Sequence, residues 1–495
     1  MKGSFLLPFL IKVNIDFMPA YQKKGFIVGL ALFFILLFIP APEGLNIKAW
    51  TVAAIAVLMA VWWATEAIPV AVTALLPLAL FPLMDVTSFE SAAVPYANKN
   101  IYLFLGGFIL ALGIENSGLH KRIALKMILA VGSSGARLVG GFMLVSALIS
   151  MWVMNTSTTL MLLPIGLAVC TVMADTIPGL TDKQKKDFDT ALLLGIAYAA
   201  TIGGMSTLIG TAPNIVFSAF MLDAYGVEIS MVSWMTLAIP LASILLLGAW
   251  ILLTKYVFKI NFEASVESRT ELQNMLNSMG NLTKDEIRIS MIFGLAVFAW
   301  VFRTLLNNID FLSGLTDAGV AIIAAILIFM TPSASKRGDL LEWEKSKELP
   351  WGLLILFGGG LSLASQISSS GLGIWIGESL IVLSTIPPIF LILAIATLII
   401  FLTEITSNVT TTTTFLPVFG GLAIAIGVLP VSLAIPVCLA ASCAFMLPVA
   451  TPPNAIVYGS NKFTIATMMR AGLLLNIIGI FVVTLFAYYI APMVF

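Results

Sequence analysis

Two short stretches of the sequence place amide and hydroxyl side chains inside otherwise apolar runs. Residues 150–159 read SMWVMNTSTT, and residues 403–414 read TEITSNVTTTTT. Asparagine, serine and threonine supply hydrogen-bond donors and oxygen acceptors without adding a charge. Neither stretch contains lysine or arginine. A ligand bound there would therefore be held by dipoles and hydroxyl groups, or by cations that bind beside it.

Two further stretches combine glycine, threonine, proline and asparagine inside apolar runs. Residues 203–214 read GGMSTLIGTAPN, and residues 444–454 read AFMLPVATPPN. Proline removes an amide donor and interrupts a helix, and glycine permits close approach of another backbone. A broken helix exposes N–H groups at its N-terminal end, which suit an anion, and carbonyl groups at its C-terminal end, which suit Na⁺. Two such half-sites that meet would bind a small carboxylate flanked by cations.

The composition shows what surrounds these polar stretches. Of the 495 residues, 60% are hydrophobic and only 10% are charged, whereas soluble domains carry about 25% charged residues. The chain is therefore predicted to be an all-α polytopic membrane protein embedded in a lipid bilayer, and its long continuous apolar runs exclude a β-barrel. Lys+Arg and Asp+Glu balance at 25 each, so no net charge recruits nucleic acid. A single histidine and the lack of clustered acids argue against an enzyme.

Hydropathy and loop charge predict about eleven transmembrane helices plus two re-entrant hairpins, at residues 138–172 and 389–424. In this topology the basic loops lie in the cytoplasm with the N-terminus, and the C-terminus lies outside. Residues 1–25 are expected to form an interfacial segment, residues 26–48 an extra first span, and residues 259–285 a cytoplasmic linker. The compact loops favour a bacterial plasma membrane, that is, an inner membrane.

The two halves of the chain resemble each other. Asn155 recurs as Asn408, 253 positions later, and the same offset relates the motif LFLGG of the first half to LFGGG of the second. The repeats span residues 49–258 and 286–495. Each repeat contains five predicted spans and one hairpin, and because five is odd, the two repeats have opposite topology. Inverted repeats are typical of secondary transporters that work by alternating access.

Three titratable residues lie near predicted span ends. Glu66 and Glu404 each follow a threonine, and we interpret both as structural carboxylates. His120 lies in the basic stretch GLHKRIA, where we expect it to face solvent or lipid.

From about Trp62 to the C-terminus, the sequence resembles the divalent anion:sodium symporter family, which includes dicarboxylate and citrate transporters. The resemblance rests on WWATEAIPVAVTALLPLALFP, GLHKRIAL, the Asn-Thr tip, TEITSNVTTTTTFLPVF and VATPPNAIVYGS. It implies the inverted-repeat fold of the ion transporter superfamily, usually as a homodimer. It also implies scaffold and transport domains, interleaved across both repeats, that move against each other in an elevator motion.

The resemblance also implies roles for particular residues. The two sodium sites would use Ser150, Asn155 and Gly203 in the first half, and Thr403, Asn408 and Ala450 in the second. Substrate would contact Asn155, Thr156, Ser407, Asn408, Thr211, Thr451 and Pro452. The family carries Ser-Asn-Thr at each tip, whereas this chain has Met154 at the first serine position. A thioether cannot replace a hydroxyl as a donor or a hard-cation ligand.

We therefore expect sodium-coupled uptake of a C4-dicarboxylate such as succinate, fumarate or malate, with Na⁺ as coupling ion and no organic cofactor. Two alternatives stay open. One is a sodium-independent dicarboxylate exchanger of the same fold, which Met154 favours. The other is a symporter for a tricarboxylate such as citrate, or for sulfate.

Overall fold

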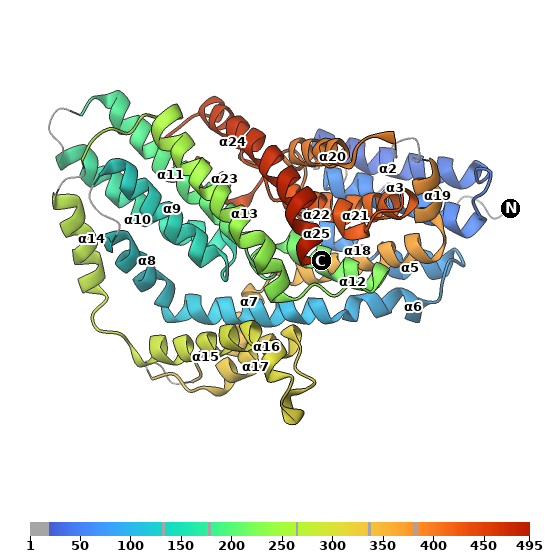
Figure 1. Cartoon of the computed structure of the whole chain (residues 1–495), viewed down its shortest axis with the longest axis horizontal. Coiled ribbons are helices and arrows are strands. Elements are labelled where there is room, and N and C mark those ends of the chain that lie inside the picture. The colour runs from blue at the N-terminus through green and yellow to red at the C-terminus, as the bar shows by residue number, and fades with distance from the viewer. Residues whose placement is uncertain (1–18, 131–133, 177–179, 264–265, 335–337, 380–384) are drawn as a thin grey trace.

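The computed structural model describes residues 19–130, 134–176, 180–263, 266–334, 338–379 and 385–495. Within these ranges the regular elements are helices, with two isolated β-bridges and no strand (Figure 1). Seven of the described helices are long and apolar enough to cross a membrane, and several shorter apolar helices accompany them. The predicted all-α polytopic class is confirmed, whereas the count of about eleven spans stays a prediction.

The first half of the chain supplies the helices before the linker. They are α2 (Ala20–Phe38), α3 (Ile47–Thr65), α4 (Val70–Thr73), α5 (Leu76–Leu83), α6 (Phe89–Ala93), η2 (Val94–Ala97), α7 (Lys99–Ser117), α8 (Leu119–Ala130), α9 (Gly135–Ser150), α10 (Asn155–Thr176), α11 (Asp182–Gly204), α12 (Ala212–Tyr225), α13 (Met231–Ile251) and the π-helical turn η3 (Leu252–Val257). Most of the predicted interfacial segment lies outside the described residues, and its last residues, from Ala20, begin α2.

The linker contains α14 (Val266–Ser278), and the second half follows it. Its helices are α15 (Lys284–Val301), α16 (Arg303–Leu306), η4 (Asp310–Leu312), α17 (Asp317–Met330), η5 (Trp343–Glu348), α18 (Trp351–Ser369), α19 (Leu372–Ser379), α20 (Pro388–Thr403), α21 (Asn408–Ala425), α22 (Pro430–Ala441), α23 (Pro452–Tyr458), α24 (Ile465–Leu485), the π-helical turn η7 (Phe486–Ile490) and α25 (Ala491–Val494).

The polar stretches lie where consecutive helices meet. Helices α9 and α10 join at residues 151–154, and α20 and α21 join at residues 404–407. Helix α11 is separated from α12 by residues 205–211, and α22 from α23 by residues 442–451. The half-helices that follow these breaks pack on the opposite half of the chain, since α12 contacts α21 and α22 whereas α23 contacts α10 and α11. Each half of the chain therefore supplies a half-helix that packs on the hairpin and broken helix of the other half.

Helices α7 and α18, which carry the repeated LF·GG motif, contact each other at matched positions. The rings of Phe104 and Phe357 pack edge to face with centroids 5.1 Å apart. A side chain at Gly106 would collide with the backbone of Ala321 in α17, and one at Gly359 with the backbone of Ala74 next to α4. The repeated glycines are therefore needed because a neighbouring chain segment approaches each helix closely.

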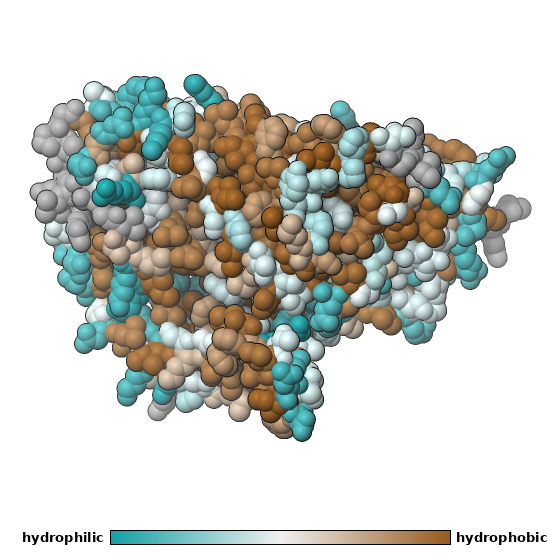
Figure 2. Space-filling model, viewed as in Figure 1, coloured by the Kyte–Doolittle hydropathy of each residue, from teal (hydrophilic) through white to brown (hydrophobic). Residues whose placement is uncertain are grey.

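The surface that faces outward is largely apolar. Figure 2 shows a broad hydrophobic area across the middle of the molecule and hydrophilic residues towards its ends. Exposed apolar side chains on α13, α15 and α24 contribute to it, among them Leu247, Leu295 and Phe481. Such a surface is typical of a protein that contacts lipid.

Helix α8 does not continue α7 as one span. Gly118 adopts a left-handed conformation with φ of 77° and ends α7, so α8 turns back to pack on α9 and α14. His120 is consequently buried, with Nδ1 3.1 Å from the carbonyl oxygen of Ile114. The expectation that His120 faces solvent or lipid is therefore wrong, because the turn at Gly118 directs it inward.

A buried ion pair fixes the linker region. Arg122 Nε of α8 donates to Glu286 Oε1 of α15 at 2.8 Å, and the two side chains are only 6% and 2% exposed. The remaining guanidinium nitrogens donate to the carbonyl oxygens of Met279, Gly280 and Asn281. One arginine thus joins α8, α15 and the segment after α14.

Removing one partner of this pair is expected to destabilise the protein strongly. Glu286→Ala would leave the Arg122 charge buried and uncompensated, at a cost of roughly 3–5 kcal/mol. A thermal unfolding scan in detergent should show a large loss, whereas Glu348→Ala, which removes an exposed ion pair with Lys345, should change little. The double variant Arg122→Leu/Glu286→Leu should be more stable than Glu286→Ala. A double variant that is less stable than Glu286→Ala would contradict this account.

Candidate substrate and cation site

A partly open cavity of about 790 Å³ lies between the two hairpin tips and the two helix breaks. The residues predicted to contact substrate all line it: Asn155, Thr156, Thr211, Ser407, Asn408, Thr451 and Pro452. Ala450 and Met154 line it too. The cavity is not lined by Ser150, Gly203 or Thr403. These three residues are buried, and each lies a few residues before a lining residue in the sequence. The volume suits a small ligand.

The first half-site is built around the amide of Asn155, the first residue of α10. Ser150 Oγ, at the end of α9, donates to Asn155 Oδ1 at 2.5 Å. A Cβ at Gly204 would collide with the same amide, and one at Gly203 with the backbone of Ala147. The glycine pair therefore lets the end of α11 lie directly against α9 and the hairpin tip. Thr207 ties this break to the tip, because its Oγ1 donates to the carbonyl oxygen of Met151.

The second half-site repeats this arrangement around Asn408, the first residue of α21. Thr403 Oγ1 lies 2.7 Å from Asn408 Oδ1 and 3.0 Å from the carbonyl oxygen of Ala441. A hydroxyl has one proton, which the two acceptor oxygens would have to share. Three oxygens thus converge with a single hydrogen among them, which favours a bound cation as the group that completes the cluster.

Both helix breaks are closed by an asparagine at equivalent positions. Asn214 Nδ2 donates to the carbonyl oxygens ten and seven residues earlier, those of Gly204 and Thr207, at 3.3 and 2.7 Å. Asn454 Nδ2 donates to those of Ala444 and Leu447, also ten and seven residues earlier, both at 3.1 Å. The TxPN motif therefore satisfies carbonyl groups that the interrupted helices leave unpaired.

Glu404 supports the second break and has no acidic counterpart in the first. Its buried carboxylate accepts the backbone N–H groups of Phe445, Met446 and Leu447 at 2.8 to 3.0 Å. Asn476 of α24 donates to the same carboxylate at 2.7 Å. Glu404 thus has the structural role expected of it. Asn476 was not predicted from the sequence, although a lone asparagine in an apolar helix is a signal of a buried polar partner.

The electrostatics of the cavity favour an anion. Helices α10, α12 and α21 begin at residues that line it, Asn155, Ala212 and Asn408, so three positive dipole ends point towards it. Among the lining residues that the structure describes, Glu66 alone carries a full charge. It is exposed and sits in a left-handed conformation at the end of α3. A dianion bound here would therefore need cations beside it.

The donor set fits sodium. The candidate ligands are amide, hydroxyl and backbone carbonyl oxygens, which are the ligands of hard cations. In the second half, Ser442 Oγ and Asn454 Oδ1 are buried without a hydrogen-bond partner, so the segment next to this half-site holds further oxygens that a cation could use. Met154 lines the cavity at the position where a hydroxyl was expected.

Paired polar tips and helix breaks that surround one cavity in a polytopic helical protein are typical of a membrane transporter. Residues 22–495 match the family model described as "Sodium:sulfate symporter transmembrane region". The chain therefore belongs to the sodium:sulfate symporter family, the divalent anion:sodium symporters that its motifs resemble.

Relatives with similar sequences are named sodium-dependent dicarboxylate transporters. The chain is 40% identical over 475 residues to the sodium-dependent dicarboxylate transporter SdcS of Staphylococcus saprophyticus, covering 95% of this chain and 92% of that protein. It is 40% identical over 479 residues to SdcS of Staphylococcus aureus strain USA300, covering 96% and 92%. Among solved structures, the Alcanivorax borkumensis YdaH transporter aligns with a TM-score of 0.54 at 14% identity over 96% of this chain and 97% of that one. That likeness concerns the fold alone.

Glu404→Gln should weaken cation binding by loosening the second break. The amide nitrogen of glutamine cannot accept the N–H bonds that now go to a carboxylate oxygen, at a cost of roughly 1–3 kcal/mol. The stabilisation of the purified protein by NaCl over KCl should therefore need about ten-fold more Na⁺, measured by thermal unfolding. Glu348→Gln, an exposed substitution, serves as control. Equal sodium dependence in Glu404→Gln and the parent would contradict this role.

Proposed function

We propose that the protein catalyses sodium-coupled uptake of C4-dicarboxylates such as succinate, fumarate and malate. The observation that carries the proposal is the convergence of three helix N-termini on one cavity whose described lining has no cationic side chain. Two of these helices begin at an asparagine, Asn155 or Asn408, that is bonded to a buried hydroxyl group behind the cavity wall. Dipoles can orient two carboxylates, but a dianion in a low-dielectric site needs co-bound positive charge. The relatives named sodium-dependent dicarboxylate transporters support both the ion and the substrate class.

The proposed sodium sites follow the two half-sites. Ser150, Asn155 and Gly203 would form the first, and Thr403, Asn408 and Ala450 the second. Sodium bound behind each tip would hold the tip helix in place and add positive potential at its N-terminus. The substrate carboxylates would then contact the residues that line the cavity between the tips. Coupling arises because neither ligand has a complete site without the other.

Transport would proceed by an elevator movement within a homodimer in the plasma membrane, with the N-terminus in the cytoplasm. The moving part would be the bundle, defined here as α9–α13 and α20–α24, which contains the tips and breaks. The static part would be the frame, defined as α2–α7 and α15–α18. Most of the packing supports this division, because α11 packs on α9, α22 on α21 and α24 on α13, whereas α17 packs on α7 and α18 on α4. The two parts meet where α12 packs on α7 and α18, and where α21 packs on α18.

A second candidate function is sodium-independent exchange of dicarboxylates by the same fold. The position of Met154 favours it, because this side chain lines the cavity where a hydroxyl would contact substrate or Na⁺. Backbone carbonyl groups at the same tip could still bind the cation.

Uptake of radiolabelled succinate into proteoliposomes tests the proposal. An inward Na⁺ gradient should concentrate succinate in empty vesicles, and a K⁺ gradient should not. Asn155→Ala and Asn408→Ala should each reduce uptake about ten- to hundred-fold, since each removes a bond to a charged ligand. Asn116→Ala, whose amide bonds the carbonyl oxygen of Leu340 away from the cavity, is the matched control.

Two results would change the assignment. Uptake that is independent of Na⁺ but requires succinate inside the vesicles would show that the protein is an exchanger. If the vesicles take up no succinate but take up citrate or sulfate in a Na⁺-dependent way, the substrate is citrate or sulfate.

A further inference from the structure

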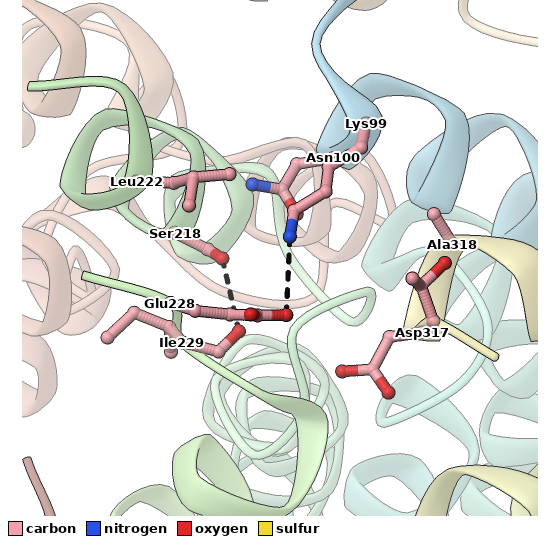
Figure 3. A pocket seen from close by; sticks show the side chains of 9 residues that line it. Lys99, Asn100, Ser218, Leu222, Glu228, Ile229, Asp317 and Ala318 are labelled. Atoms are coloured by element: carbon pink, nitrogen blue, oxygen red, sulfur yellow. Dashed lines mark hydrogen bonds and ion pairs between the residues drawn. The ribbon is translucent and has the colours of Figure 1, made fainter. Parts of the chain in front are cut away.

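The turn between α12 and α13, residues 226–230, is joined to the frame by side chains from three of its helices. Lys99 Nζ, at the start of α7, lies 3.2 Å from Glu228 Oε1 of the turn, and Arg303 Nη1 of α16 lies 3.5 Å from the same oxygen. Figure 3 shows Lys99 and Glu228 facing each other across a small hollow, with Asp317 nearby.

Two more contacts cross the same boundary. Asp317 Oδ2, at the start of α17, accepts the backbone N–H of Met231, the first residue of α13, at 2.8 Å. Asn98 Nδ2 donates to Asp223 Oδ1, near the end of α12, at 2.6 Å. Arg303 Nε also pairs with Asp317 Oδ1 at 3.2 Å within the frame. Arg303 and Asp317 are thus paired with each other within the frame, and each also contacts the α12–α13 segment, Arg303 through Glu228 and Asp317 through the N–H of Met231.

The exposure of these groups differs from that of a permanent structural pair. Glu228 and Lys99 side chains are 51% and 40% exposed, whereas Arg122 and Glu286 are 6% and 2% exposed. The other two charged residues that hold the turn, Arg303 and Asp317, are 17% and 10% exposed, and they would keep each other as partners within the frame if the turn separated. A half-exposed pair regains water when it separates, so it can open at little cost. A buried pair cannot. The hollow beside Glu228, about 10 Å³, is large enough for one water molecule.

The charge state of Glu228 suits such a contact. Burial by itself would raise the pKa of Glu228, but the hydrogen bond and charge of Lys99, together with the charge of Arg303, hold that pKa below its ordinary value. The carboxylate is therefore ionised at neutral pH and binds both cations.

We propose that the α12–α13 turn and the residues that hold it, Asn98, Lys99, Arg303 and Asp317, form a releasable latch between bundle and frame. The latch is closed in the conformation described here and opens in each transport cycle. This inference rests on the proposed function, because it requires a bundle that moves. Trp300 also connects the latch to the first half-site. Its Nε1 donates to the carbonyl oxygen of Asp317, and its ring stacks on that of Trp152 in the hairpin tip, with ring centroids 6.0 Å apart.

A reversible cross-link tests the latch. Asn98→Cys/Asp223→Cys places two thiols where the side chains now touch, and the three native cysteines are buried. Purified protein is treated with a short bifunctional methanethiosulfonate and reconstituted, and sodium-driven succinate uptake is measured before and after reduction. We expect cross-linked protein to be inactive and reduced protein to recover. The control Lys48→Cys/Asp85→Cys joins two exposed partners within the frame, and its cross-link should leave uptake intact.

The outcomes separate the latch from the proposed function. Cross-linked Asn98→Cys/Asp223→Cys that transports at the parent rate would overturn the latch and leave the function standing. Failure of these thiols to cross-link would overturn it too. Parent protein without sodium-driven succinate uptake would overturn the proposed function instead.

A second variant measures the contribution of Glu228. Adding Glu228→Gln to the cysteine pair removes the charge that binds Lys99 and Arg303, so the closed contact should form less often. The rate of cross-linking should fall about two- to five-fold, the range expected for a partly exposed ion pair. An unchanged rate would show that the charges do not hold the latch closed.

Discussion

Every backbone N–H and C=O group inside a membrane must find a partner within the protein, because lipid offers none. This protein interrupts helices at four places within its apolar core, and the remaining structure supplies the missing partners. Asn214 and Asn454 bond the carbonyl groups before each break. Glu404 bonds the N–H groups of the second break, and Thr207 joins the first break to its hairpin tip. The first residues of α10, α12 and α21 line the cavity, and the unpaired N–H groups of these helix N-termini are available to a ligand there.

The same constraint explains why binding of two ligands would be coupled. The helix N-termini that line the cavity would attract an anion, yet its described walls offer no full positive charge. Burying a dianion there alone would be costly, and burying sodium alone would leave its charge partly uncompensated. Each ligand lowers the cost of the other. By linkage, the factor by which Na⁺ raises substrate affinity must equal the factor by which substrate raises Na⁺ affinity.

Much of the fold and of the candidate site could be predicted from the sequence, because the features that matter there are local. The Asn155 and Asn408 tips and the two TxPN motifs repeat at nearly constant offsets, and the structure brings them to one cavity. The pairs that could not be predicted join distant segments, such as Arg122 with Glu286 and Glu404 with Asn476. These contacts depend on how the helices pack against each other, and the spacing of residues in the sequence does not predict that packing. His120 was misjudged for the same reason: the turn at Gly118 directs it inward.

The central claim is that anion and cation sites are complete only together, and calorimetric titration of purified protein tests it most directly. Succinate would be titrated in NaCl and in KCl at equal ionic strength, and NaCl would be titrated with and without succinate. The account predicts that succinate affinity rises by at least about ten-fold in Na⁺, and that succinate raises Na⁺ affinity by the same factor. Succinate binding of equal affinity in both salts would contradict it.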